Sequence, residues 1–145
     1  VGTTNQIIGN SGRGAQLFSS NCSRCHRVDG KGGSLGPDLS NITGRRSQNV
    51  LIRSIRNPSA NIARLYKPVS FITVANESVQ GAIKSEDAFS IQLMDSNQVL
   101  RGFSKSDLRE LRREEQSLMP SFTGSSLSDS DVNDLLSFLQ SSRSP

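Results

Sequence analysis

The chain has 145 residues, about the length of one domain, with 33% hydrophobic residues, 5% aromatics and a formal net charge of +4. No apolar run reaches the ~18–20 residues of a membrane span, so we expect no membrane span, and a signal peptide that is removed or absent. Two cysteines, Cys22 and Cys25, build no disulfide framework, and a single histidine excludes metal sites with several histidines. With so few apolar residues, the core is expected to need another contribution, for which small domains often use a metal, a disulfide or a bound group.

The charge is distributed unevenly along the chain. Residues 1–70 hold ten basic and two acidic residues, a balance of +8, whereas residues 71–145 hold seven basic and eleven acidic ones, a balance of −4. A basic half can bind an acidic protein, anionic lipid or nucleic acid, or simply keep the chain soluble. Since no Lys/Arg run exceeds two residues and aromatics are sparse, no nucleic-acid partner is expected.

The first half of the chain predicts two short helices separated by a loop. Apolar spacing indicates a helix over about 13–22, with Ser11 as its N-cap. Four glycines and a proline make 29–38 a loop. A second helix is predicted over 47–57, and Pro58 ends it.

From Val69 the hydrophobic period changes from helical to alternating. Turn signals separate four alternating runs, which begin at Val69, Val79, Phe89 and Gln98, and this pattern predicts an antiparallel meander. Lys105–Glu115 fits either a helical turn or a fifth strand that closes the sheet.

The C-terminal region predicts a third helix. Ser128 is a plausible N-cap, and acidic residues in the first turn favour a helix start there. The apolar residues that follow recur at helical spacing: Val132, Leu135, Leu136 and Leu139.

Cys22, Cys25 and His26 form a Cys-x-x-Cys-His motif, the attachment signature of c-type haem. Two thiols at this spacing near a helix end can form thioethers with the two vinyl groups of one porphyrin, and the imidazole that follows can reach the iron. A thioredoxin-like redox pair would require a βαβ context, and a zinc site would require carboxylates to complete four ligands. A ligating histidine usually donates its other N–H to an oxygen, for which the backbone carbonyl of Pro37 is the candidate.

The candidates for a second axial ligand are Met94, Met119, Tyr66, a lysine or water. Met94 lies within a predicted strand, where methionine normally packs in the core. Met119 lies in an irregular loop before the last helix, and Pro120 holds the chain extended there, so its thioether can be presented to iron.

Together these residues resemble class I cytochrome c. The resemblance runs from about Gly14 to Ser142 and is closest to the C-terminal haem-binding domain of large bacterial membrane-bound dehydrogenase-like proteins. Three segments carry this narrower likeness: 36–42 (Gly-Pro-Asp-Leu-Ser-Asn-Ile), 57–62 (Asn-Pro-Ser-Ala-Asn-Ile) and 117–120 (Ser-Leu-Met-Pro).

The resemblance implies a mainly α cytochrome c fold around one covalent haem, with an inserted small antiparallel β meander or barrel, α+β overall. It implies one domain over residues 1–145 with three parts: an N-terminal haem-binding part (11–68), an inserted β subdomain (69–115), and a Met loop with the C-terminal helix (116–142). The strongly charged segment 109–116 has no feature that fixes its structure.

By the same resemblance, Cys22 and Cys25 carry the thioethers of one haem c, His26 is the proximal ligand, Met119 is the distal ligand, and Pro37 orients His26. These ligands imply a one-electron carrier rather than an enzyme, placed in the periplasm or at the outer cell face because covalent haem attachment occurs outside the cytoplasm. A dehydrogenase or oxidase is the implied redox partner, with a dehydrogenase as the electron donor.

Two other functions remain open from the sequence: a five-coordinate haem sensor or peroxidase, and a partner-binding module formed by the β insert. Five basic residues near the motif either steer an acidic redox partner or are solvated charges: Arg24, Arg27, Lys31, Arg45 and Arg46.

Overall fold

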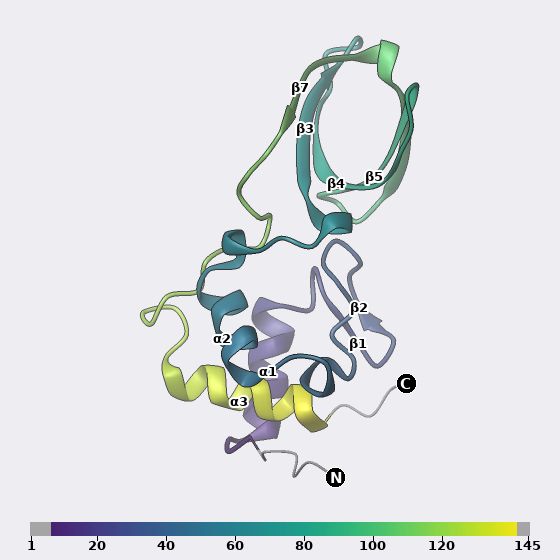
Figure 1. The fold of residues 1–145 in the computed structure, drawn as a ribbon. Helices are drawn as coiled ribbons and strands as arrows, with labels where there is room; N and C mark the ends of the chain where they lie inside the picture. The colour runs from purple at the N-terminus through teal and green to yellow at the C-terminus, as the bar shows by residue number, and fades with distance from the viewer. Residues whose placement is uncertain (1–6, 142–145) are drawn as a thin grey trace.

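A computed structural model describes residues 7–141 of the chain, and Figure 1 shows a helical part below a curled β-sheet. The elements follow the order α1 (Ser11–Asn21), β1 (Arg27–Val28), β2 (Lys31–Gly32), α2 (Gln48–Arg56), β3 (Pro68–Thr73), β4 (Ser78–Glu86), β5 (Ser90–Asp95), β6 (Leu100–Ser104), β7 (Leu108–Arg113) and α3 (Asp129–Ser141). Short 3₁₀ helices lie at Ile42–Gly44, Pro58–Ala60, Arg64–Tyr66 and Lys105–Asp107.

The helices begin where side-chain caps satisfy their first amides. Asn10, rather than the predicted Ser11, caps α1, because its Oδ1 accepts a hydrogen bond from Arg13 N. Ser47 caps α2, as expected from the sequence. Ser128 and Asp131 bond each other's backbone N–H at the start of α3, which forms a reciprocal capping box.

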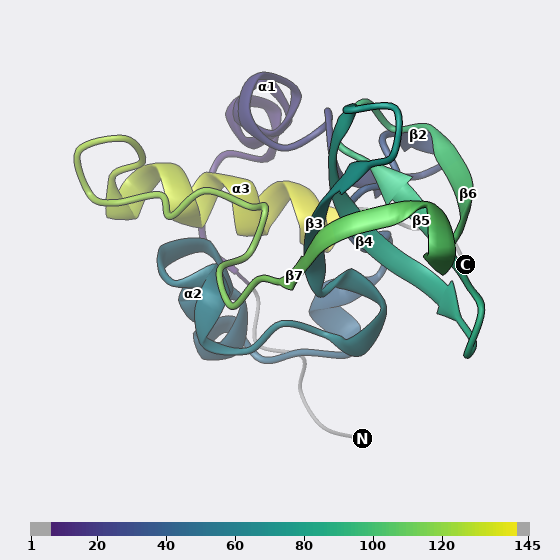
Figure 2. The ribbon, with the colours of Figure 1, turned by 90° about the horizontal axis from the view of Figure 1, so that it is seen from above.

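The helical core forms around α3, which lies between α1 and α2 when the molecule is seen from above (Figure 2). Phe18 of α1 packs its ring 5.3 Å from that of Phe138 of α3. Leu136 of α3 is fully buried, and Leu51 of α2 belongs to the same cluster. The termini of the described chain thus meet in one core, which the C-terminal helix completes.

Gly14 sits where α1 crosses α3. A Cβ at this position would lie 1.9 Å from the carbonyl oxygen of Asp134, a backbone atom that cannot move aside cheaply. Gly14→Ala is therefore expected to lower the free energy of unfolding by about 2 kcal/mol, measured by urea denaturation. Gly12→Ala on the same helix is the control, because its Cβ would meet only Asn10 Oδ1 at 3.4 Å. A Gly14 variant as stable as the Gly12 variant would contradict this crossing geometry.

The five-stranded sheet is antiparallel throughout, in the order β6-β5-β4-β3-β7. It curls so that the strands form a ring in Figure 1, around a core separate from that of the helices. Phe71 and Phe103 make an edge-to-face contact at 4.9 Å within this core. The insert is therefore held together by its own buried side chains.

The sheet departs from the sequence prediction in two places. Phe89 is 81% exposed, because it lies in the turn before β5 instead of on the inner face with Ile91. Gln98 also lies in a turn, since β6 begins only at Leu100. The segment after Lys105, for which the sequence left a helical turn or a fifth strand open, is a 3₁₀ turn followed by β7, which joins the sheet beside β3 as its fifth strand.

The chain has a mixed α+β architecture. Helices α1–α3 form one part of the described chain and the five-stranded sheet forms the other, so the description as mainly α is not confirmed. Within residues 7–141, none of the helices has the length and apolar character required to cross a membrane.

Candidate functional site

One cavity of about 410 Å³ in the helical part is lined by all five residues that the sequence singled out: Cys22, Cys25, His26, Pro37 and Met119. Most of its exposed surface is apolar. Leu51 and Ile55 of α2 contribute to its walls, as do Leu136 and Leu139 of α3. Segments almost one hundred residues apart along the chain therefore meet around a single apolar space.

The Cys-x-x-Cys-His segment forms a tight turn directly after α1. Cys22 is the C-cap of the helix, and its N–H bonds the carbonyl of Phe18 at 2.8 Å. The N–H groups of Cys25 and His26 then both bond the carbonyl of Cys22, at 3.1 and 2.9 Å. This turn brings both thiols and the imidazole to the same cavity.

His26 is only 8% exposed, and its ring is held by an oriented hydrogen bond. Its Nδ1 lies 2.8 Å from the carbonyl oxygen of Pro37, which can only accept, so Nδ1 carries the proton. Nε2 is left as the nitrogen with a free lone pair. Burial lowers the pKa of His26, and the Pro37 bond opposes this shift, so the neutral ring is favoured. A neutral imidazole fixed in this way suits a metal ligand.

The loop that supplies Pro37 approaches the imidazole closely at Gly36. A Cβ on Gly36 would lie 2.6 Å from Cε1 of His26, so the ring packs directly against the glycine backbone. The Gly36 N–H also bonds the carbonyl of Cys25 at 2.8 Å, which ties the loop to the Cys-x-x-Cys-His turn.

The two cysteines, both within the described residues, are not joined by a disulfide. Burial raises the pKa of Cys22 to about 11, and the neighbouring Cys25 adds to this shift. Since reactive dithiol motifs depend on a lowered thiol pKa, the thioredoxin-like alternative loses support. In the described part of the chain, no group of three or more His, Cys, Asp or Glu side chains is arranged to hold a metal ion, which also weakens the zinc alternative.

Met119 and Met94 lie in different parts of the molecule. Met119 lines the cavity, half-buried, in a loop that Ser117 shapes by accepting the Met119 N–H at 3.1 Å. Ser59, next to α2, in turn accepts the N–H of Ser117 at 2.9 Å. Met94 belongs to β5, which pairs with its neighbours in the sheet. Tyr66, another candidate from the sequence, also lines the cavity.

Arg56 holds the Met119 loop against α2, a role that the sequence did not reveal. Its guanidinium donates to the carbonyls of Phe122 and Leu127 and forms an ion pair with Asp129 at 2.9 Å. The Phe122 N–H also bonds the carbonyl of Ile55 at 3.1 Å. An arginine in the last turn of an amphipathic helix gives no signal of such partners, because all of them lie more than 60 residues away.

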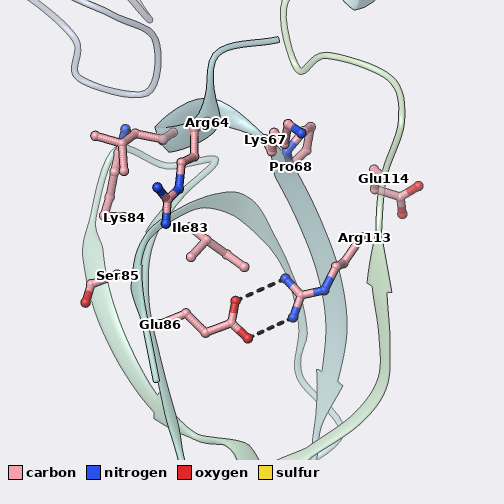
Figure 3. A pocket seen from close by; sticks show the side chains of 10 residues that line it. Arg64, Lys67, Pro68, Ile83, Lys84, Ser85, Glu86, Arg113 and Glu114 are labelled. Atoms are coloured by element: carbon pink, nitrogen blue, oxygen red, sulfur yellow. Dashed lines mark hydrogen bonds and ion pairs between the residues drawn. The ribbon is translucent and has the colours of Figure 1, made fainter. Parts of the chain in front are cut away.

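A second cavity, of about 380 Å³, opens at the end of the sheet nearest Arg64–Tyr66 and is shown in Figure 3. Arg113 and Glu86 form a bidentate pair in it, and this pairing lowers the pKa of Glu86 to about 2, with help from Lys105. Lys84 stacks over the Tyr66 ring at 3.7 Å. This charged lining contains no cysteine, histidine or methionine, so of these two cavities in the described residues the apolar one suits a haem.

Comparison with known proteins agrees with the geometry. The family model described as Cytochrome c matches residues 11–91, more than half of the chain. The chain therefore belongs to the cytochrome c family: it is a haem-based electron carrier with covalently bound haem c and its iron. No curated protein matches the chain. The matched region contains Cys22, Cys25, His26 and Pro37, and it ends before Met119.

The residues that line the apolar cavity fit a covalently bound haem. Two thiols and a neutral imidazole lie together on one apolar cavity, and a thioether reaches the same cavity from another loop. Arg45 and Arg46, on the same lining, supply positive charge.

Proposed function

We propose that the protein is a periplasmic one-electron carrier with a His/Met-ligated c-type haem. In this proposal Cys22 and Cys25 hold the haem through thioethers, His26 is the proximal ligand and Met119 the distal one. The observation that carries the proposal is their convergence on one apolar cavity from two segments far apart in sequence. The haem, when bound, supplies an iron that accepts and releases one electron.

The chain's own residues set the conditions for that electron transfer. The Pro37 carbonyl keeps the His26 imidazole in one tautomer and one orientation. Arg56 fixes the loop that carries Met119. Apolar walls exclude water and favour the less charged, reduced state, and methionine ligation acts in the same direction. With His26 and Met119 both holding the iron, the haem would offer no position for a substrate, so it would supply electron transfer rather than bond chemistry.

A dehydrogenase is the proposed electron donor, in line with the resemblance of segments 36–42, 57–62 and 117–120. Three exposed basic residues lie in this region: Arg24 within the Cys-x-x-Cys-His turn, and Arg27 and Lys31 in the β1–β2 hairpin that follows it. Their charge favours an acidic partner surface. A donor steered by these charges should reduce the protein more slowly as salt concentration rises.

The test is the visible spectrum of the purified holoprotein in both oxidation states, together with its mass. A His/Met carrier is expected to show covalent haem by mass, a low-spin spectrum, and a weak band near the red end in the oxidised form. The reduced protein should bind carbon monoxide slowly or not at all. A high-spin spectrum with rapid carbon monoxide binding would overturn the carrier and favour a five-coordinate sensor or peroxidase.

A further inference from the structure

Gln98 joins the β insert to the haem part of the chain. It lies in the turn between β5 and β6, and its Oε1 accepts hydrogen bonds from the backbone N–H groups of Ser34 and Leu35, each at 2.8 Å. Both donors belong to the loop that continues into Gly36 and Pro37. One side chain of the insert thus holds the loop that orients His26.

The other end of the same amide faces the haem-attachment turn. Nε2 of Gln98 lies 3.9 Å from Sγ of Cys25, within the range of a weak N–H···S contact. The contacted loop is tied to this turn from its other side as well, because Gly33 N bonds Ser23 O and Gly36 N bonds Cys25 O. A movement of Gln98 would therefore reach both the loop and the sulfur of Cys25.

The backbone conformation at Gln98 indicates that this position requires the glutamine side chain, rather than a residue that merely forms the turn. Its φ is +68°, in the left-handed region where glycine and asparagine are favoured and glutamine is strained. If the residue only shaped the turn, glycine would serve better. The strained conformation is offset by the contacts of the side chain with residues 63 and more positions away.

We propose that Gln98 is a positioning residue for the haem. Its amide clamps loop 33–36 in place and sets the polar environment of the Cys25 sulfur, through which the insert tunes the reduction potential. This role rests on the proposed function, in which Cys25 carries a thioether and His26 binds the iron.

Two substitutions in the holoprotein test separately the clamp on loop 33–36 and the effect of Gln98 on the polar environment of the Cys25 sulfur. Gln98→Gly removes the clamp while relieving the backbone, so amide hydrogen exchange at Ser34 and Leu35 should accelerate at least about tenfold, the size expected for a lost hydrogen bond. Gln98→Glu keeps both accepted bonds and adds a negative charge beside Cys25. It should leave exchange at these two amides unchanged and lower the reduction potential.

Asn97→Asp is the matched control, since it adds the same charge at an exposed neighbour in the same turn. The Gln98→Glu variant should have the lower potential of the two. Equal potentials in the two acidic variants, or unchanged exchange at Ser34 and Leu35 in Gln98→Gly, would overturn the role of Gln98. A holoprotein preparation whose mass shows no haem on Cys22 and Cys25 would instead refute the proposed function, while the exchange measurement would still test the clamp.

Discussion

Met119→Ala is expected to lower the reduction potential of the haem by on the order of 0.1 V, within the ~0.8 V range that axial ligands span. The thioether of methionine stabilises the reduced iron, and alanine leaves that position to water or to no ligand. The weak red-end band of the oxidised protein should vanish, and the reduced protein should bind carbon monoxide. Potentiometric titration and visible spectroscopy measure these changes.

Met94→Leu provides the control within the same chain. Met94 lies in β5, where it pairs with Ala82 and Leu100, so its loss should leave the band and the potential unchanged. If Met119→Ala kept the red-end band, Met119 would not be the distal ligand. Tyr66, which lines the same cavity, would then be the next candidate to replace.

Gly36→Ala should destabilise the protein by about 3 kcal/mol, at the upper end of the cost of overpacking, because the added atom meets the buried ring of His26. The added Cβ would lie 2.6 Å from Cε1 and 2.9 Å from Nδ1 of His26, so the ring must move. That movement strains or breaks the bond from Nδ1 to the Pro37 carbonyl. We therefore expect a lower urea midpoint and, in the holoprotein, a loss of low-spin character.

Gly124→Ala is the matched substitution without a predicted effect, because nothing lies within 4 Å of the Cβ that it adds. It should retain the wild-type spectrum and a urea midpoint close to that of the wild type. A Gly36 variant with the same spectrum and midpoint as the Gly124 variant would show that the imidazole does not depend on the close approach of this loop.

The candidate site could be proposed from the sequence because its chemistry is concentrated in short motifs. The spacing of Cys22, Cys25 and His26 specifies a haem-attachment turn whatever the surrounding fold, and the structure places all three on one cavity. Met119 was separable from Met94 because a proline follows it in a loop, whereas Met94 continues an alternating strand pattern. The local sequence around each methionine is therefore enough to distinguish Met119 from Met94 as the candidate ligand.

The parts that the sequence left open depend on distant contacts. Strand β7 escaped a firm prediction because its residues after Leu108 are exposed on both faces, so no alternation marks it. Phe89 was placed on the inner face by period alone, but the turn before β5 leaves it in solvent. Gln98 and Arg56 act through partners more than 60 residues away, which no local pattern reveals.

The hydrogen bond between Ser59 and Ser117 has a consequence for how this chain can vary. The chain passes from the haem part to the insert near Ser59 and returns near Ser117, and this hydrogen bond joins the two connecting segments. The residues between them therefore form a loop that is closed at its base. The five-stranded sheet within this loop has its own hydrophobic core. Such an arrangement tolerates variation in those parts of the sheet that do not contact the haem part, because longer strands or loops there leave the two crossing points in place. The insert can therefore lengthen or diverge away from the haem part, whereas Gln98, which bonds the loop at Ser34 and Leu35, and Tyr66, which lines the cavity, limit its replacement.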